Sequence, residues 1–314
     1  MSCIYKPIDL TKLKTYSLFD RKSKVSVTDF AKPWQKGATF KNFLDSLPDI
    51  LAGDQIQKVI SSITSAVKNK KTIVFAMGAH VIKVGLNPIV IDLINRNVIS
   101  SVAMNGAGII HDLEIAMAGQ TSEDVSESIE DGSFGMAHET CTFLCDAINK
   151  AQDESIGLGE AVGRFIIEKD LPYKDKSILA TCSKKGIPAT IHIAIGTDII
   201  HMHAKFDPMK AGGATHKDFR TFASVITTLN KGVYLNVGSA VILPEIFLKA
   251  VTLVRNLGYF LEDFTTVNMD FIKHYRPVAN VVNRPTAKGG QGINLIGHHE
   301  IMLPIIAAGV IEQI

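Results

Sequence analysis

The sequence lacks the features that would direct a protein to nucleic acid or to an oxidising compartment. Its 33 Lys and Arg residues nearly balance 31 Asp and Glu residues, and the net charge of +2 is too small to attract a polyanion. Four of the 314 residues are cysteines, and no two of them have the CxxC spacing of a metal site. We therefore expect free thiols and no nucleic-acid partner.

Long apolar runs are also missing. Gly, Asn or Lys interrupts each apolar stretch before it reaches the roughly 18 residues that a membrane helix needs. The first residues, MSCIYKPIDLTKLKTYSLFDRKSKV, carry charged or polar side chains every few positions, unlike the apolar core of a secretory signal. These patterns predict a cytoplasmic protein with no membrane partner.

Enough apolar residues are present for a large core, since 46% of the chain is hydrophobic. We predict an N-terminal arm over residues 1–39 and an α/β domain over residues 40–314 that begins with a helical extension. Short apolar runs then alternate with amphipathic segments, which is typical of a Rossmann-like, doubly wound, mostly parallel sheet with helices on both faces. The predicted strands cover residues 72–77, 98–104, 188–195, 232–237, 264–268 and 278–282, and the main helices cover 86–95, 217–229, 244–256 and 300–311.

One strand end carries a distinctive turn. In VISSVAMNGAGIIHDLEIAMAG an apolar run stops at Asn105-Gly106-Ala107-Gly108, and an amphipathic segment follows. Glycines permit a tight turn with close ligand approach, and the free N–H groups of a following helix favour an anion. The turn is therefore a candidate binding site.

Polar or Gly-rich residues follow the other predicted strands as well. Ligands of open parallel sheets bind beyond the carboxyl ends of the strands, so these residues should share one binding edge. Each of them alone could equally be a helix cap. The group comprises Gly78, Ala79 and His80; Asn105 to Gly108, His111 and Asp112; Gly196, Thr197, Asp198, His201 and His203; Gly238, Ser239 and Glu245; and Thr266, Asn268 and Asp270.

Two specific motifs are absent. The first predicted strand leads into FAMGAHVIKVG, which is not the dinucleotide fingerprint GxGxxG, and the ten histidines include no HExxH. We therefore predict no metal site, although converging histidines leave a metal-assisted alternative open.

From about Phe40 to the C-terminus, the chain resembles the deoxyhypusine synthase family. The resemblance lies in the order of VFAMGAHVIKVG, MNGAGIIHDL, IPATIHIAIGTD, GVYLNVGSAV with VRNLG, FTTVN and IMLPIIAAGVI. It implies an NAD-dependent homotetramer that oxidises spermidine and passes an aminobutyl group, through an imine on a lysine, to a lysine of an acceptor protein. The substrate would be a small amine.

The resemblance also implies a set of cofactor contacts, and Asp112 matches the acidic end of one family motif. The implied NAD contacts are Ala79, His80, Val81, Ile82, Asn105, Gly106, Ala107, Asp198, Thr266 and Val267.

The chain departs from the family where the reaction takes place. Ile110-His111 stands where the family has two carboxylates, and His298-His299 stands where it has Asp-Ala. The paired histidines of the polyamine site fall on Pro244-Glu245 or on Ile246-Phe247. The segment GGQGINLIGHHE has no imine-forming lysine at the matching place, and Lys288 lies several residues early.

These departures leave three hypotheses. The first is a deoxyhypusine synthase-like transferase that uses NAD, with Glu245, His111, Lys288 and His298 as catalytic candidates. The second is the same fold with different His and Glu acid–base chemistry on another substrate, with or without a metal. The third is a non-catalytic paralogue that kept the oligomer.

Overall fold

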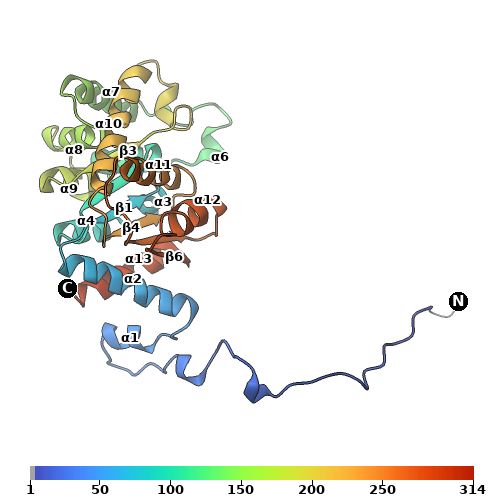
Figure 1. The fold of residues 1–314 in the computed structure, drawn as a ribbon. Helices are drawn as coiled ribbons and strands as arrows, with labels where there is room; N and C mark the ends of the chain where they lie inside the picture. The colour runs from blue at the N-terminus through green and yellow to red at the C-terminus, as the bar shows by residue number, and fades with distance from the viewer. Residues whose placement is uncertain (1–3) are drawn as a thin grey trace.

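Six parallel strands form the centre of the protein in the computed structural model, which describes residues 4–314. Their order is β3-β2-β1-β4-β5-β6, and every neighbouring pair is parallel. Helices lie on both sides of this sheet (Figure 1). The predicted doubly wound α/β fold is therefore confirmed. The strands are β1 Ile73–Met77, β2 Ser101–Asn105, β3 Ala189–His192, β4 Val233–Val237, β5 Thr265–Asp270 and β6 Gln291–Ile296.

Alternate side chains of each strand enter two different cores. Phe75 and Met77 of β1 pack in the larger core, whereas Val74 and Ala76 pack in the smaller one. Both sets are buried, which is why the strand is a continuous apolar run. The smaller core lies mainly beneath two helices, α10 Pro208–Ile226 and α11 Ile242–Asn256. The larger core is covered by eight helices: α2 Leu51–Lys68, α3 His80–Lys83, α4 Asn87–Asn95, α5 Gly106–Ala118, α7 His138–Asp153, α8 Leu158–Glu168, α9 Ile178–Lys185 and α13 His299–Ile311.

Aromatic rings fill the smaller core. The rings of Tyr234 on β4 and Phe247 on α11 are stacked with centroids 3.7 Å apart, and Phe264 meets Phe247 edge-on. Aromatic pairs of this kind add to the burial of apolar area. They hold α11 against the second face of the sheet.

Three asparagines form a buried ladder on that same face. Asn236, Asn268 and Asn294 stand opposite one another on β4, β5 and β6. The Nδ2 of Asn236 donates to Asn268 Oδ1, and the Nδ2 of Asn268 donates to Asn294 Oδ1, each at 2.8 Å. These two hydrogen bonds link the three side chains across the strands, although the Oδ1 atom of Asn236 is buried without a partner among residues 4–314.

The sixth strand differs from the prediction. Residues 278–282 were expected to form it, but Val278–Asn283 is a π-helical segment, η5, that directly follows α12 Tyr275–Pro277. A short apolar run does not distinguish a buried strand from a buried helical turn. The strand is Gln291–Ile296, in a segment whose glycines indicated a loop.

The helix before β4 also begins earlier than predicted. It starts at Pro208, where the Asp207 side chain accepts hydrogen bonds from the N–H groups of Met209 and Lys210. Gly212 and Gly213 lie in its second turn and lowered the apparent helix propensity of this stretch.

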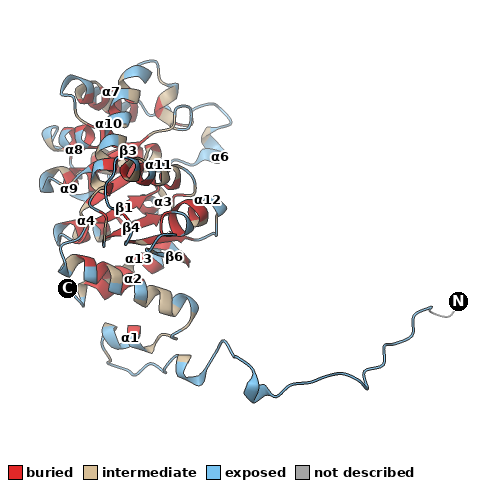
Figure 2. Cartoon of the chain, in the orientation of Figure 1, coloured by how far each residue is buried: buried red, intermediate tan, exposed pale blue. Residues whose placement is uncertain are grey.

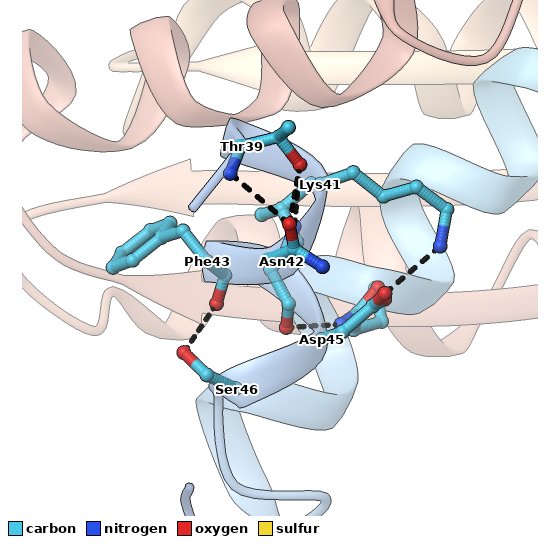
Figure 3. A network of polar contacts seen from close by, with 8 residues as sticks. Thr39, Lys41, Asn42, Phe43, Asp45 and Ser46 are labelled. Carbon is cyan, nitrogen blue, oxygen red and sulfur yellow. Dashed lines mark hydrogen bonds and ion pairs between the residues drawn. The ribbon is translucent and has the colours of Figure 1, made fainter. Parts of the chain in front are cut away.

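The arm extends away from the domain and is mostly exposed between residue 4 and the first helix, α1 Phe40–Ser46 (Figures 1 and 2). A capping box begins that helix. The N–H of Thr39 donates to Asn42 Oδ1 at 3.0 Å, and the N–H of Asn42 donates to Thr39 Oγ1 at 3.3 Å (Figure 3). Lys41 pairs with Asp45 at 2.8 Å on the exposed side. The short elements of the chain are η1 Leu18–Asp20, η2 Val27–Asp29, α6 Val125–Ser128, η3 Lys174–Lys176 and η4 Ile199–Met202.

Within residues 4–314 no helix is both long and apolar enough to cross a bilayer. Cys141, Cys145 and Cys182 are buried free thiols, while Cys3 lies outside the described residues.

Candidate functional site

All six strands end at the same edge of the sheet. The strand order reverses between β1 and β4, because the chain adds β2 and β3 on one side of β1 and then β4, β5 and β6 on the other. In folds of this kind, ligands bind at the carboxyl ends of the two strands where the order reverses. Here the turns after these two strands touch. A Cβ atom on Gly78 would collide with the carbonyl oxygen of Gly238, so only backbone fits between them.

A cavity of about 510 Å³ opens on the β2 and β3 side of this edge. Its volume is in the range of small-molecule sites, which span about 300–1,000 Å³. Four residues predicted for the binding edge line it: Ala107, His111, Thr197 and Asp198. The remaining lining residues are Lys83, Ile110, Glu114, Gln120, Thr121, Ser122, Glu123, Val125, Phe134, Ala137 and Ile199.

The start of α5 forms one wall of the cavity. The Asn105 side chain caps the helix by accepting from the N–H of Gly108 at 3.0 Å. Gly106 suits the first helical position because a Cβ atom there would collide with the Asp198 carboxylate and displace it. The structure thus brings the turn at residue 105 and Asp198 together, as the shared binding edge required.

Asp198 has an unusual environment. Its Oδ2 atom is buried and has no hydrogen-bond partner among residues 4–314. Burial raises the pKa of Asp198 to about 6, against a smaller opposing effect of a backbone hydrogen bond at Ala194. The neighbouring His201 stabilises the loop after β3, because its Nδ1 accepts hydrogen bonds from the N–H groups of Gly196 and Asp198 at 3.1 and 3.3 Å.

His111 belongs to a hydrogen-bonded group on the α5 side of the cavity. Its Nδ1 lies 2.6 Å from Thr121 Oγ1, and the Thr121 hydroxyl in turn donates to Glu114. Thr140 donates to the other Glu114 oxygen at 3.0 Å. The sequence reasoning missed Glu114 and Thr121. Glu114 lies three residues after His111 on the same helix face, which is the one signal that could have indicated the pair.

A second group of predicted residues meets above β1, β5 and β6. The rings of His80 and His299 have centroids 5.5 Å apart, and both contact Phe271. His299 is fully buried and its Nε2 lies 3.1 Å from the Met269 carbonyl oxygen. His298 is exposed at the start of α13 and stacks on Phe271. Neither Ala79 nor these residues line the cavity.

Glu245 lies apart from the cavity and is already engaged. It pairs with Lys249, accepts from Arg276 Nε at 2.8 Å, and accepts from Asn280 Nδ2 at 2.8 Å. The hydrogen bond with Lys249, together with that from Arg276, lowers the pKa of this carboxylate despite some desolvation. These contacts tie α11 to η5.

Lys288, a catalytic candidate from the sequence, does not lie at the binding edge. Lys288 is exposed and precedes β6, so it lies at the amino end of the strands. All six strands are parallel, which puts this end opposite the edge that carries Asn105 and Asp198. The misassigned sixth strand explains the error, because the loop at Lys288 seemed to follow a strand.

Four predicted cofactor contacts are interior residues. Thr266 is fully buried near the start of β5, which runs on to Asp270, so the expectation that it follows a strand is wrong, and Val267 beside it is a core residue. Val81 and Ile82 are core residues of α3.

Asp112 is also an interior residue. It accepts from the N–H groups of Ile178 and Leu179 at 2.8 and 3.0 Å and thereby caps α9.

Within residues 4–314 no group of three or more His, Cys, Asp or Glu side chains is placed to hold a metal ion.

Comparison with known proteins supports the fold. No family model and no curated protein matches the sequence. The ternary complex of AgrE with ornithine and NAD+ aligns with 82% of this chain at 12% identity and a TM-score of 0.51. A conserved protein from Methanococcus maripaludis S2, described as LOR/SDH, aligns with 88% of this chain and 71% of its own at 15% identity and a TM-score of 0.50. At these identities the likeness establishes the fold alone.

The lengths of these proteins differ. This chain spans about a third of the AgrE structure, 32% of its length, and 31% of the cyanobacterial arginine dihydrolase ArgZ. A protein from Entamoeba histolytica described as a deoxyhypusine synthase aligns with 90% of this chain and 96% of its own at 13% identity, but its TM-score of 0.49 is too low to support an argument.

Proposed function

We infer that the chain is an NAD-dependent enzyme that oxidises a small amine, similar to deoxyhypusine synthases in fold and different in its acid–base groups. The observation that carries this proposal is the Asp198 carboxylate. It lies at the wall of a ligand-sized cavity beside the start of α5, and its Oδ2 atom is buried without a partner. Such an atom needs a donor, and a ribose hydroxyl of the cofactor would supply one.

The surroundings of Asp198 fit a nucleotide. A helix start provides N–H groups that favour a negatively charged ligand group, and Lys83 lines the same cavity. Asp198 would hold the ribose, and Ala107 would leave room beside the helix for the ligand. NAD would supply the hydride acceptor when bound. The AgrE complex, which contains ornithine and NAD+, has the same fold and so agrees with this proposal.

The cavity also suits a cationic amine. Asp198, Glu114 and Glu123 place three carboxylates around it, against one lysine. A protonated amine would gain favourable interaction with this set of charges. The transfer of an aminoalkyl group would additionally need a carrier lysine, which Lys288 does not provide from the opposite edge of the sheet. We therefore propose the oxidation step and spermidine-like amines as the substrate class.

Calorimetric titration with NAD tests the cofactor. Asp198→Asn should weaken NAD binding at least about tenfold, because a hydrogen bond to a charged group contributes about 1.5–3 kcal/mol. Asp153→Asn is the matched control, since this exposed carboxylate at the end of α7 lies outside the cavity. Incubation with NAD and spermidine should then produce the absorbance of reduced nicotinamide. Lack of NAD binding at millimolar concentration would refute the proposal.

The alternative is acid–base chemistry on another substrate without NAD. The contact of His111 with Thr121 and Glu114 favours it, because histidine can accept or donate a proton near neutral pH. The same titration separates the two, since this alternative predicts a folded protein that does not bind NAD.

A further inference from the structure

The chain of hydrogen bonds from Glu114 to His111 has a defined direction. Burial alone would raise the pKa of Glu114, but the nearby His111 and the hydrogen bonds from Thr121 and Thr140 outweigh it and lower that pKa. Glu114 is therefore ionised at neutral pH and can only accept. The single hydroxyl proton of Thr121 points to Glu114, which leaves the Thr121 oxygen as an acceptor toward His111.

This direction fixes the tautomer of His111. A Thr121 oxygen that accepts requires a proton on His111 Nδ1, 2.6 Å away. A neutral imidazole carries one proton, so Nε2 then holds a lone pair. Nε2 makes no hydrogen bond within residues 4–314 and is not among the buried orphan atoms, so it remains open to the cavity that His111 lines.

We propose that His111 is the base of this site, accepting a proton at Nε2 from a cationic amine, and that Thr121 and Glu114 are positioning residues that hold its tautomer. In this step the ammonium N–H bond breaks, the electron pair stays on the amine nitrogen, and the proton forms a new N–H bond at Nε2. Glu114 offsets the charge of the imidazolium through Thr121. The choice of an amine rests on the proposed function, whereas the tautomer does not.

Threonines 121 and 140 offer a matched pair of variants. Both hydroxyls donate to Glu114, but only Thr121 contacts His111. A nitrogen–proton correlation spectrum of the full chain reports the protonation of each histidine nitrogen, and His111→Gln identifies the resonances of His111. The wild type should show a protonated Nδ1 and a bare Nε2. Thr121→Val should move the proton to Nε2, whereas Thr140→Val and the conservative Thr121→Ser should keep the wild-type tautomer.

Spermidine added to the same samples tests the base. We expect the His111 Nε2 resonance to shift in the wild type because its lone pair accepts a hydrogen bond from the ammonium group, and to shift less in Thr121→Val. In turnover assays, His111→Gln should lower kcat on the order of 10²-fold. A wild-type proton on Nε2, an unchanged tautomer in Thr121→Val, or no response to spermidine would each overturn the inference. Failure of NAD to bind would instead overturn the proposed function and leave the tautomer result intact.

Discussion

Three aspartates, Asp112, Asp198 and Asp218, differ in the hydrogen bonds that their carboxylates accept. Asp112 and Asp218 each accept hydrogen bonds from two backbone N–H groups, in Asp218 those of Gly159 and Ile191 at 2.9 and 2.8 Å. Asp198 instead leaves Oδ2 without a partner. The sequence around them does not tell them apart: Asp112 precedes Leu113, Asp198 precedes Ile199, and Asp218 lies between Lys217 and Phe219. Only the packed structure separates the two that stabilise helix starts from the one that faces a ligand cavity.

Asp218 should make stability depend on pH. Burial raises its pKa to about 7, above the value of about 3.9 in an unfolded chain. Between these two values the native state binds more protons than the unfolded state, so the free energy of unfolding falls as pH rises from about 4 to about 7. Urea denaturation at several pH values should show this fall, and Asp218→Asn should flatten it.

Two other carboxylates act in the same direction. The pKa values of Asp112 and Asp198 are raised to about 6 by burial, so some slope should remain in Asp218→Asn. Exposed Asp153→Asn should keep the wild-type slope. A slope in Asp218→Asn equal to that of the wild type would contradict the assignment.

Single elements explain where sequence reasoning succeeded and where it failed. The strands β1 and β4 are buried on both faces, and their continuous apolar runs were recognised almost to the residue. The last strand, β6, is exposed at Gln291, Gly292 and Ile296, so its sequence lacks such a run. The apolar run at Val278–Asn283 is itself a π-helical segment, and it packs against α11, β5 and β6. In both segments, packing against elements far away in the sequence determined whether the residues form a strand or a helix.

The glycines of two helices provide a paired test at this scale. Gly106→Ala should destabilise the fold and weaken ligand binding, because the added Cβ would displace the Asp198 carboxylate. Gly212→Ala in α10 should stabilise the protein by roughly 0.5–1 kcal/mol, since a Cβ there meets nothing within 4 Å and alanine favours helix. Thermal unfolding of both variants measures the two effects. Stabilisation by Gly106→Ala would contradict the close contact of α5 with Asp198.

For the whole molecule, the sequence predicted the parallel fold and the edge at which the cavity opens, because both follow from strand order and strand ends. It did not predict which residues meet at that edge. Ala107, His111 and Asp198 come together, while Lys288 is at the other end and Glu245 is engaged by Lys249. The position of each of these side chains depends on strand register and on the crossover connections between strands. A short stretch of sequence contains no information about either.

The arm should be independent of the stability of the domain. Residues 4–28 are exposed, so removal of residues 1–25 should leave the free energy of unfolding unchanged. Removal of residues 1–46 should lower it, because that deletion takes away α1 and the buried Leu44. Urea denaturation compares the two. Sedimentation of the same proteins tests the predicted homotetramer, and a domain destabilised by the shorter deletion would contradict the prediction.

The asparagine ladder has a consequence for how the chain finds its fold. The apolar residues of β4, β5 and β6 could pack in several alignments, but successive side chains point to opposite faces. A slip of β5 by one residue would carry Asn268 away from both Asn236 and Asn294 and leave buried amides unsatisfied. The three amides therefore favour a single register of β4, β5 and β6. The apolar residues stabilise the contact between these strands but do not select one register.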